Sequence, residues 1–445
     1  MEVENFSKEW VRPSSPTPSF LRTYKISLLD QFIPSICIPL ILYYPCPTQD
    51  TDIALKRSLL LKQSLSETLA YFYPFAGKVK DNFSIDCDDE GVYYVEARAN
   101  ISLFEYLKQP DLPSMNKLIP VEASLQESTP GSHVAMIQET TFACGGFTIG
   151  VLVSHIVSDG TTLSSFLKAW AAIACKSSNE IVCPNFDGPS IFLQHDAFPK
   201  EVSMIAFTGP FFRKMKGSTR RILFDGSSIA SLQMKATSLN VKNPTRVEVV
   251  TAFLSKCLMG IFNKPLAITH AVNLRRRAVP PFPEFSIGNF LWLAAALFTL
   301  KEIETEIELS SIVQQMREAI GKINDDTVKK LQGDGGFHEL CGMVKEASGE
   351  LARAGFISGA EYVSFTSWCN FGLYEVDFGW GKPVWTTSVG SNNSEIMFVN
   401  SVVLMDARKD KGIEAWMFLD EADILRLEKD EELLQYAFID PCPLS

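Results

Sequence analysis

The sequence is organised around one stretch, Val151-Leu152-Val153-Ser154-His155-Ile156-Val157-Ser158-Asp159-Gly160. Its apolar half predicts a buried strand that ends in a histidine, and an acid and a glycine follow four and five residues later. A histidine where a strand ends and the chain turns can reach into a cleft. Its ordinary pKa of about 6.5 suits proton transfer at neutral pH. His155 is therefore the first candidate for a general base.

The segments on both sides predict a β-hairpin and then a helix. Residues 133–142 and 147–153 are rich in strand-forming residues, and the Ala143-Cys144-Gly145-Gly146 segment between them suits a hairpin turn. Apolar residues then recur at helical spacing, at Leu163, Phe166, Leu167 and Trp170. Asp159 stands at the N-cap position of that helix. Two interpretations stay open at this point: an acid that orients His155, or a helix cap beside a packed histidine.

The remaining chain predicts two halves that mix strands and helices without a regular βαβ alternation. We expect an N-terminal domain at 1–178, a Pro- and Gly-rich crossover at 179–219 and a C-terminal domain at 220–445. Strands are expected at 23–30, 36–44, 220–224, 396–405 and 412–418. Helices are expected at 54–72, 247–261 and 312–323. The expected class is a mixed α/β (α+β) fold rather than a dinucleotide-binding one.

Composition excludes several classes of function. A net charge of −11 argues against nucleic acid as a partner. The ten cysteines contain no CxxC pair and no Cys/His cluster with zinc spacing, so no metal site is expected. The acidic start lacks the features of a signal peptide, and no apolar stretch approaches the ~20 residues that span a bilayer. We expect a cytoplasmic protein that has no membrane partner.

Two further segments stand out by composition. Ala271-Val272-Asn273-Leu274-Arg275 closes an apolar strand with an arginine that can pair with a buried carboxylate. Asp377-Phe378-Gly379-Trp380-Gly381 places two glycines around a tryptophan, which indicates a sharply shaped loop. Alone, each is as compatible with a surface charge or a structural loop as with a functional site.

Together, the HxxxD segment at 155–159, Asn273-Leu274-Arg275 and the DFGWG loop resemble the BAHD family of plant acyl-CoA-dependent acyltransferases. Similar segments are Ser27-Leu28-Leu29-Asp30-Gln31, residues 73–78 and Thr366-Ser367-Trp368. The resemblance covers nearly the whole chain. It is closest to the branch that holds vinorine synthase and the O-acetyltransferases of alkaloids and triterpenoids.

The resemblance implies a two-domain chloramphenicol-acetyltransferase-like fold with mixed sheets and a central solvent channel. It implies His155 as the general base, with no acyl-enzyme. Asp159 and Arg275 would form a structural ion pair that fixes the His155 loop. The loop residues Asp377, Gly379, Trp380 and Gly381 would support the site from a distance. Thr366 or Trp368 would donate a hydrogen bond to the oxyanion or line the pocket.

The same resemblance implies acetyl-CoA as a co-substrate, no permanently bound cofactor and a monomer. The acceptor would be a hydroxyl of a bulky polycyclic alkaloid, triterpenoid or limonoid. An amine acceptor or a longer acyl donor would use the same scaffold. A serine hydrolase is disfavoured because the chain has no G-x-S-x-G elbow, and a silent binding protein is disfavoured because the motifs are intact.

Overall fold

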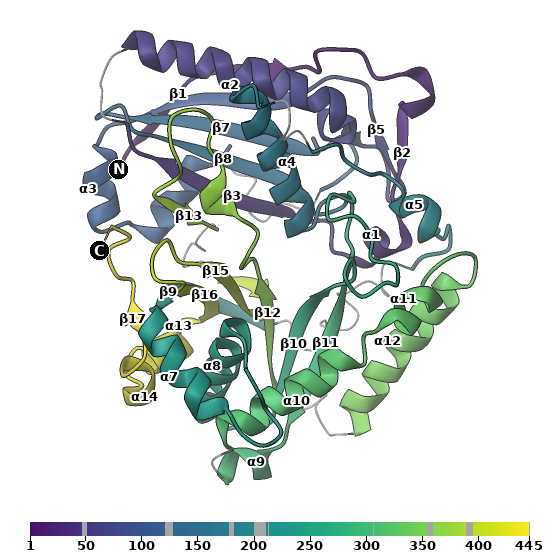
Figure 1. Ribbon diagram of the computed structural model, residues 1–445, viewed down its shortest axis with the longest axis vertical. Helices are drawn as coiled ribbons and strands as arrows, with labels where there is room; N and C mark the ends of the chain where they lie inside the picture. The colour runs from purple at the N-terminus through teal and green to yellow at the C-terminus, as the bar shows by residue number, and fades with distance from the viewer. Residues whose placement is uncertain are drawn as a thin grey trace.

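The computed structural model describes residues 1–46, 51–120, 128–177, 182–199, 211, 213–305, 307–353, 359–388 and 395–444. Within these ranges the strands form a six-stranded sheet, an eight-stranded sheet and a small three-stranded sheet (Figure 1). The two large sheets are mixed, with helices packed against them. The fold is therefore mixed α/β, as the sequence predicts.

The six-stranded sheet carries the central motif. Its order is β1 (Val3–Val11), β6 (Val92–Ala99), β7 (Ala135–Phe142), β8 (Phe147–Ser154), β3 (Cys37–Tyr44) and β13 (Trp385–Thr387). β8 pairs antiparallel with both neighbours, and every one of its residues is buried. Helices α2 (Thr51–Tyr71) and α4 (Gly160–Ala174) lie over this sheet (Figure 1). A strand covered in this way reads as a continuous apolar run.

The eight-stranded sheet belongs to the second half of the chain. Its order is β11 (Leu291–Phe298), β10 (Leu266–Asn273), β12 (Glu361–Ser367), β15 (Asn400–Asp406), β16 (Ile413–Asp420), β9 (Arg213–Phe224) and β14 (Glu395–Phe398), and β17 (Phe438–Ile439) also pairs with β9. β12 runs parallel to both β10 and β15. The small sheet consists of β2 (Thr23–Lys25), β5 (Ser84–Asp86) and β4 (Lys78–Val79).

The remaining helices pack mainly around the second sheet. They are α1 (Leu28–Phe32), α3 (Leu103–Lys108), α5 (Gly188–Ile191), α7 (Gly226–Ala236), α8 (Arg246–Phe262), α9 (Leu300–Glu304), α10 (Leu309–Gly321), α11 (Asp325–Lys330), α12 (Gly336–Arg353), α13 (Glu421–Leu427) and α14 (Glu431–Leu434). No helix in the described ranges is long and apolar enough to cross a bilayer.

The two halves of the chain are interlocked. β13, from residues 385–387, pairs with β3 and completes the first sheet, and Trp385 and Trp416 lie in its core. In exchange, Leu28 and Phe32 of α1 are buried in the core of the second sheet. Each core therefore contains side chains from both halves, so neither core is complete without the other half.

The sequence places most elements of the first half well, with one clear error. The hairpin, the helix after the motif and the helix at 54–72 are confirmed as β7–β8, α4 and α2. The strand expected at 23–30 is wrong beyond Lys25. Ser27 and Asp30 form a capping box that begins α1, because the Ser27 hydroxyl accepts the Asp30 N–H and the Asp30 carboxylate accepts the Ser27 N–H.

In the second half, the strand expected at 396–405 is two strands, β14 and β15. β9 begins at Arg213, before the expected 220. Of the expected crossover, residues 179–181, 200–210 and 212 lie outside the described residues. The domain boundaries at 178 and 220 stay predictions. β1, which the sequence pattern does not predict, is an edge strand paired with β6.

Candidate active site

The backbone of His155 is held by groups from both halves of the chain. His155 directly follows β8, and its N–H donates to the carbonyl of Ile36 at 2.7 Å. Its own carbonyl accepts the side-chain amide of Asn289 at 2.6 Å. The position of the imidazole therefore depends on how the two sheets dock, and not on the strand alone.

The His155 ring is half-buried and suited to act as a base. Burial lowers its pKa from the ordinary 6.5 because desolvation disfavours the imidazolium, and the Asp159 carboxylate opposes that shift only in part. Nδ1 is buried and has no hydrogen-bond partner among the described residues. The ring is consequently neutral at pH 7, with a nitrogen able to accept a proton.

The Asp159 carboxylate faces Arg275 and the start of α4. Its oxygens accept two hydrogen bonds from the Arg275 guanidinium, at 2.6 and 3.1 Å. One oxygen also caps α4 by accepting the Thr162 N–H at 2.8 Å, and the other accepts the Phe290 N–H at 3.1 Å. Of the two interpretations left open by the sequence, the geometry matches the helix cap, with the arginine as an added partner.

Arg275 is fully buried and uses its donors on several partners at once. Besides Asp159, its guanidinium donates to the carbonyls of Ser286 and Gly288 and to the Thr162 hydroxyl. Its charge also lies 4.6 Å above the centre of the Phe290 ring. A buried ion pair is stable only when its remaining polar atoms are satisfied in this manner. The pair thus joins the first turn of α4 to residues 286–290.

A second buried carboxylate, Asp30 of α1, completes the junction. The backbone N–H and the side-chain amide of Asn289 both donate to it, at 2.7 and 2.8 Å. Burial raises the pKa of Asp30 above its ordinary 3.8, and hydrogen bonds from Ser27 and Asn289 partly offset the rise. Asn289 therefore bridges Asp30 and the carbonyl of His155.

The Asp377-to-Gly381 loop lies at the opposite end of β8. The Asp377 carboxylate accepts the N–H groups of Gly379 and Gly381, whose φ angles of 103° and 95° favour glycine. Trp380 packs edge-on against Phe147, the first residue of β8, with ring centres 6.2 Å apart. His155 follows the eight residues of β8, a length of about 25 Å at the usual rise of a strand. The loop thus acts on this site only through the fold.

The segment at 366–371 contacts the start of α4 through its last residue, Phe371. The Phe371 carbonyl accepts the Ser164 hydroxyl at 2.6 Å, and a Cβ on Gly160 would lie 2.4 Å from the Phe371 ring. Glycine at position 160 therefore permits this close contact. Among the described residues, the Thr366 hydroxyl and the Trp368 indole N–H have no hydrogen-bond partner. Both groups are half-buried and can still donate to a ligand.

Trp368 also lines a cavity of about 270 Å³ at the end of β12. Arg246, Arg408 and Lys411 supply three positive charges to its wall, and Glu375 and Asp406 supply two carboxylates. Arg246 is already committed, because its guanidinium donates to Asp406 and to the carbonyl of Lys411. The net positive lining suits an anionic ligand.

Comparison with known proteins identifies the family. A model of the Transferase family matches residues 1–434. The chain belongs to this family, the BAHD acyltransferases. The epi-neemfruitin B 7-O-acetyltransferase of Melia azedarach is 46% identical and the limonoid 7-O-acetyltransferase of Citrus sinensis is 45% identical, each over the full length of both chains. The crystal structure of vinorine synthase superposes with a TM-score of 0.81 at 32% identity, covering 100% of both chains.

The chain is thus an enzyme, an acyltransferase of the BAHD family. Sequence reasoning did not predict the hydrogen bonds by which Asp30 and Asn289 support the site, although the segment 289–293 was a candidate wall of the acceptor pocket. The Ser27-to-Asp30 spacing is that of a capping box and was the available signal for Asp30. Nothing in the sequence near Asn289 reveals that it reaches both Asp30 and His155.

Asp159→Ala leaves the Arg275 guanidinium buried without its carboxylate. We expect the free energy of unfolding to fall by about 3–5 kcal/mol, with activity falling as well. Denaturant unfolding measures the first effect and an acyl-transfer assay the second. Arg276→Ala is the matched control. It removes an exposed Arg276–Glu284 pair, so it should change stability by about 0–1 kcal/mol. Lost activity with unchanged stability would instead indicate a direct catalytic role for Asp159.

Asn289→Ala removes the donor that holds the carbonyl of His155 and one donor to Asp30. We expect kcat to fall by about 10- to 100-fold because the imidazole is displaced. The pH profile should keep its inflection, since burial and not Asn289 dominates the His155 pKa. Steady-state kinetics across pH measure both effects, with the exposed Asn240→Ala as control. A wild-type kcat would contradict a positioning role.

Proposed function

We propose that this acyltransferase moves the acetyl group of acetyl-CoA to a hydroxyl of a polycyclic plant metabolite of the limonoid class. The support for the acceptor is the full-length similarity to two limonoid 7-O-acetyltransferases, at 46% and 45% identity. The support for the chemistry is the half-buried, neutral His155 at the junction of the two sheets. The second candidate for the acceptor is an alkaloid of similar bulk.

In the proposed mechanism, His155 accepts the proton of the acceptor hydroxyl as its oxygen attacks the thioester carbonyl. We assign the reacting nitrogen as Nε2, because Nδ1 is buried. The tetrahedral intermediate then expels the CoA thiolate, and the imidazolium returns the proton to it. Ester and free CoA leave, and no acyl-enzyme forms.

The oxyanion of this intermediate needs a hydrogen-bond donor. We assign that role to the Thr366 hydroxyl or the Trp368 indole N–H. Both are unpaired within the described residues, and their segment docks on the first turn of α4 through Phe371. Asp159 and Arg275 act at one remove, by fixing the turn that carries His155.

The cavity beside Trp368 is our candidate for the phosphate end of the acyl-CoA. Arg408 and Lys411 line it, and neither side chain has an ion-pair partner among the described residues. Charge-assisted hydrogen bonds from such groups suit phosphate oxygens. The monomeric state and cytoplasmic location stay predictions from the sequence.

The first experiment is a mass-spectrometric assay with purified protein and acetyl-CoA. The acceptors are a limonoid with a free 7-hydroxyl and a matched limonoid with a ketone at that carbon. We expect one added acetyl group on the first acceptor and none on the second. If the protein acylates an amine instead, the proposed acceptor is wrong. If it forms product only with a longer acyl-CoA, the proposed donor is wrong. Acetylation of the 7-keto limonoid would place the reacting hydroxyl elsewhere.

His155→Ala should lower kcat by at least about 10²-fold, the scale of a lost general base. Wild-type activity should fall as pH drops through the pKa of His155, because only the neutral ring accepts a proton. Burial puts that inflection below 6.5. Rate measurements from acid to neutral pH test this; near wild-type turnover by the variant would overturn the mechanism.

Arg408→Ala and Lys411→Ala should each raise KM for acetyl-CoA by about tenfold, equivalent to about 1.4 kcal/mol, with little change in kcat. Lys409→Ala is the control, because Lys409 lies on the same turn and does not line the cavity. Equal KM values for all three variants would mean that the phosphates of acetyl-CoA do not bind in this cavity.

A further inference from the structure

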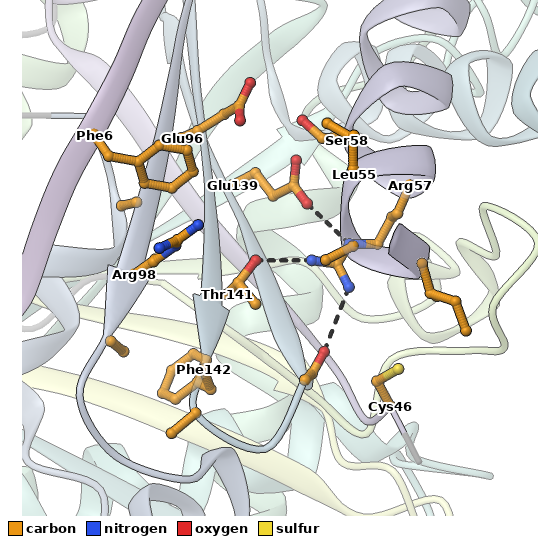
Figure 2. A pocket seen from close by; sticks show the side chains of 16 residues that line it. Phe6, Cys46, Leu55, Arg57, Ser58, Glu96, Arg98, Glu139, Thr141 and Phe142 are labelled. Atoms are coloured by element: carbon orange, nitrogen blue, oxygen red, sulfur yellow. Dashed lines mark hydrogen bonds and ion pairs between the residues drawn. The ribbon is translucent and has the colours of Figure 1, made fainter. Parts of the chain in front are cut away.

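A second cavity lies far from His155, between α2 and the outer strands of the first sheet. Its volume is about 320 Å³, the small end of the range for ligand pockets of about 300–1,000 Å³. Phe142 and Gly145, at the β7–β8 turn, are among its lining residues. Figure 2 shows Phe142 at the lower end of the cavity. That turn is separated from His155 by the whole length of β8, so this cavity is not part of the catalytic site.

The cavity exists because the first turns of α2 carry small side chains toward the sheet. Ala54 and Ser58 are four residues apart, on one face of the helix, and both line the cavity. Further along the same face, Leu61 and Leu65 fill the corresponding space and are fully buried. The gap therefore follows from the sequence of α2 and is limited to its first turns.

Large apolar side chains surround the mouth of the cavity and remain exposed. Phe6, Ile53 and Leu55 are 51%, 36% and 60% exposed. They come from β1 and α2, on both sides of the opening. Apolar side chains that gather around a concave surface mark binding sites more often than isolated ones do.

Most of the charges in the cavity are already neutralised. Arg57 is buried and donates to Glu139, to the Thr141 hydroxyl and to the carbonyl of Gly145 (Figure 2). Tyr94 donates to the second oxygen of Glu139. Nearby, Lys62 pairs with Glu9 and Glu96. These groups form a satisfied polar floor that offers little further binding energy.

Two polar groups of the cavity are available to bind a ligand. The Ser58 hydroxyl lines it, is only 5% exposed and has no hydrogen-bond partner in the described part of the chain. A buried hydroxyl without a partner is costly, and a ligand can supply the missing bond. Arg98 lies 4.7 Å above the Phe6 ring and has no ion-pair partner among the described residues. The cavity thus offers one free cation, one free hydroxyl and an apolar rim.

We propose that this cavity binds a small aromatic carboxylate. The ligand's carboxylate would pair with Arg98, its ring would lie against Phe6 and Leu55, and a polar substituent would reach the Ser58 hydroxyl. Arginine suits a carboxylate because its N–H groups match both oxygens. The site is independent of the proposed function, since none of its lining residues contacts His155 or Asp159.

Isothermal titration of the purified chain with 4-hydroxybenzoate tests the proposal. We expect saturable binding of one molecule per chain, weakened at least tenfold by Arg98→Gln and by the cavity-filling Ser58→Leu. Ser58→Ala should weaken binding several-fold. His155→Ala and the exposed control Arg276→Gln should bind as wild type does. The thermal midpoint of each variant verifies folding. Because Arg98 is exposed, Arg98→Gln should fold, and it tests the proposal even if Ser58→Leu does not fold.

Four results would overturn the proposal. The first is the absence of saturable binding to the wild-type chain. The second is equal affinity for phenol, which lacks the carboxylate. The third is unchanged affinity in Arg98→Gln, which would mean that 4-hydroxybenzoate binds elsewhere. Loss of binding in His155→Ala would also contradict it, because the ligand would then occupy the catalytic site.

Discussion

The buried ion pair between Asp159 and Arg275 is the constraint on which the rest of the site depends. Two charges removed from water are stable only if every remaining donor and acceptor finds a partner. Here the partners are the first turn of α4 and the carbonyls of residues 286–290. Satisfying the pair therefore forces the two halves of the chain into one relative position, and His155 lies at that junction.

The two halves of the chain also contribute whole elements to each other's sheet and core. β13 completes the sheet of the first half, and α1 enters the core of the second. Asp30 of α1 then binds Asn289, which in turn holds the carbonyl of His155. The polar network at the site and the apolar exchange between cores impose the same docking. A histidine positioned by two sheets is held rigidly, which is what the proposed proton transfer needs.

The two ends of β8 serve different purposes. At its end, His155 is half-buried and partly desolvated, which keeps the imidazole neutral. At its start, the ring of Phe147 contacts two groups. One is Trp380 of the DFGWG loop, and the other is the Arg57 guanidinium. The shape of the loop is thus explained by packing on the first sheet, through glycines with positive φ.

The sequence by itself determined the local elements around the motif: the hairpin, the strand that ends at His155 and the helix capped by Asp159. Periodicity, turn residues and capping are short-range effects, so they can be read from neighbouring residues. It also determined the family, because three motifs kept their order. Only the tertiary structure decided which partner each buried polar group finds. Asp159 and Arg275 are 116 residues apart, and Asp30 and Asn289 are 259 apart. Their pairing follows from the docking of two sheets whose cores share side chains, a long-range constraint that no local pattern contains.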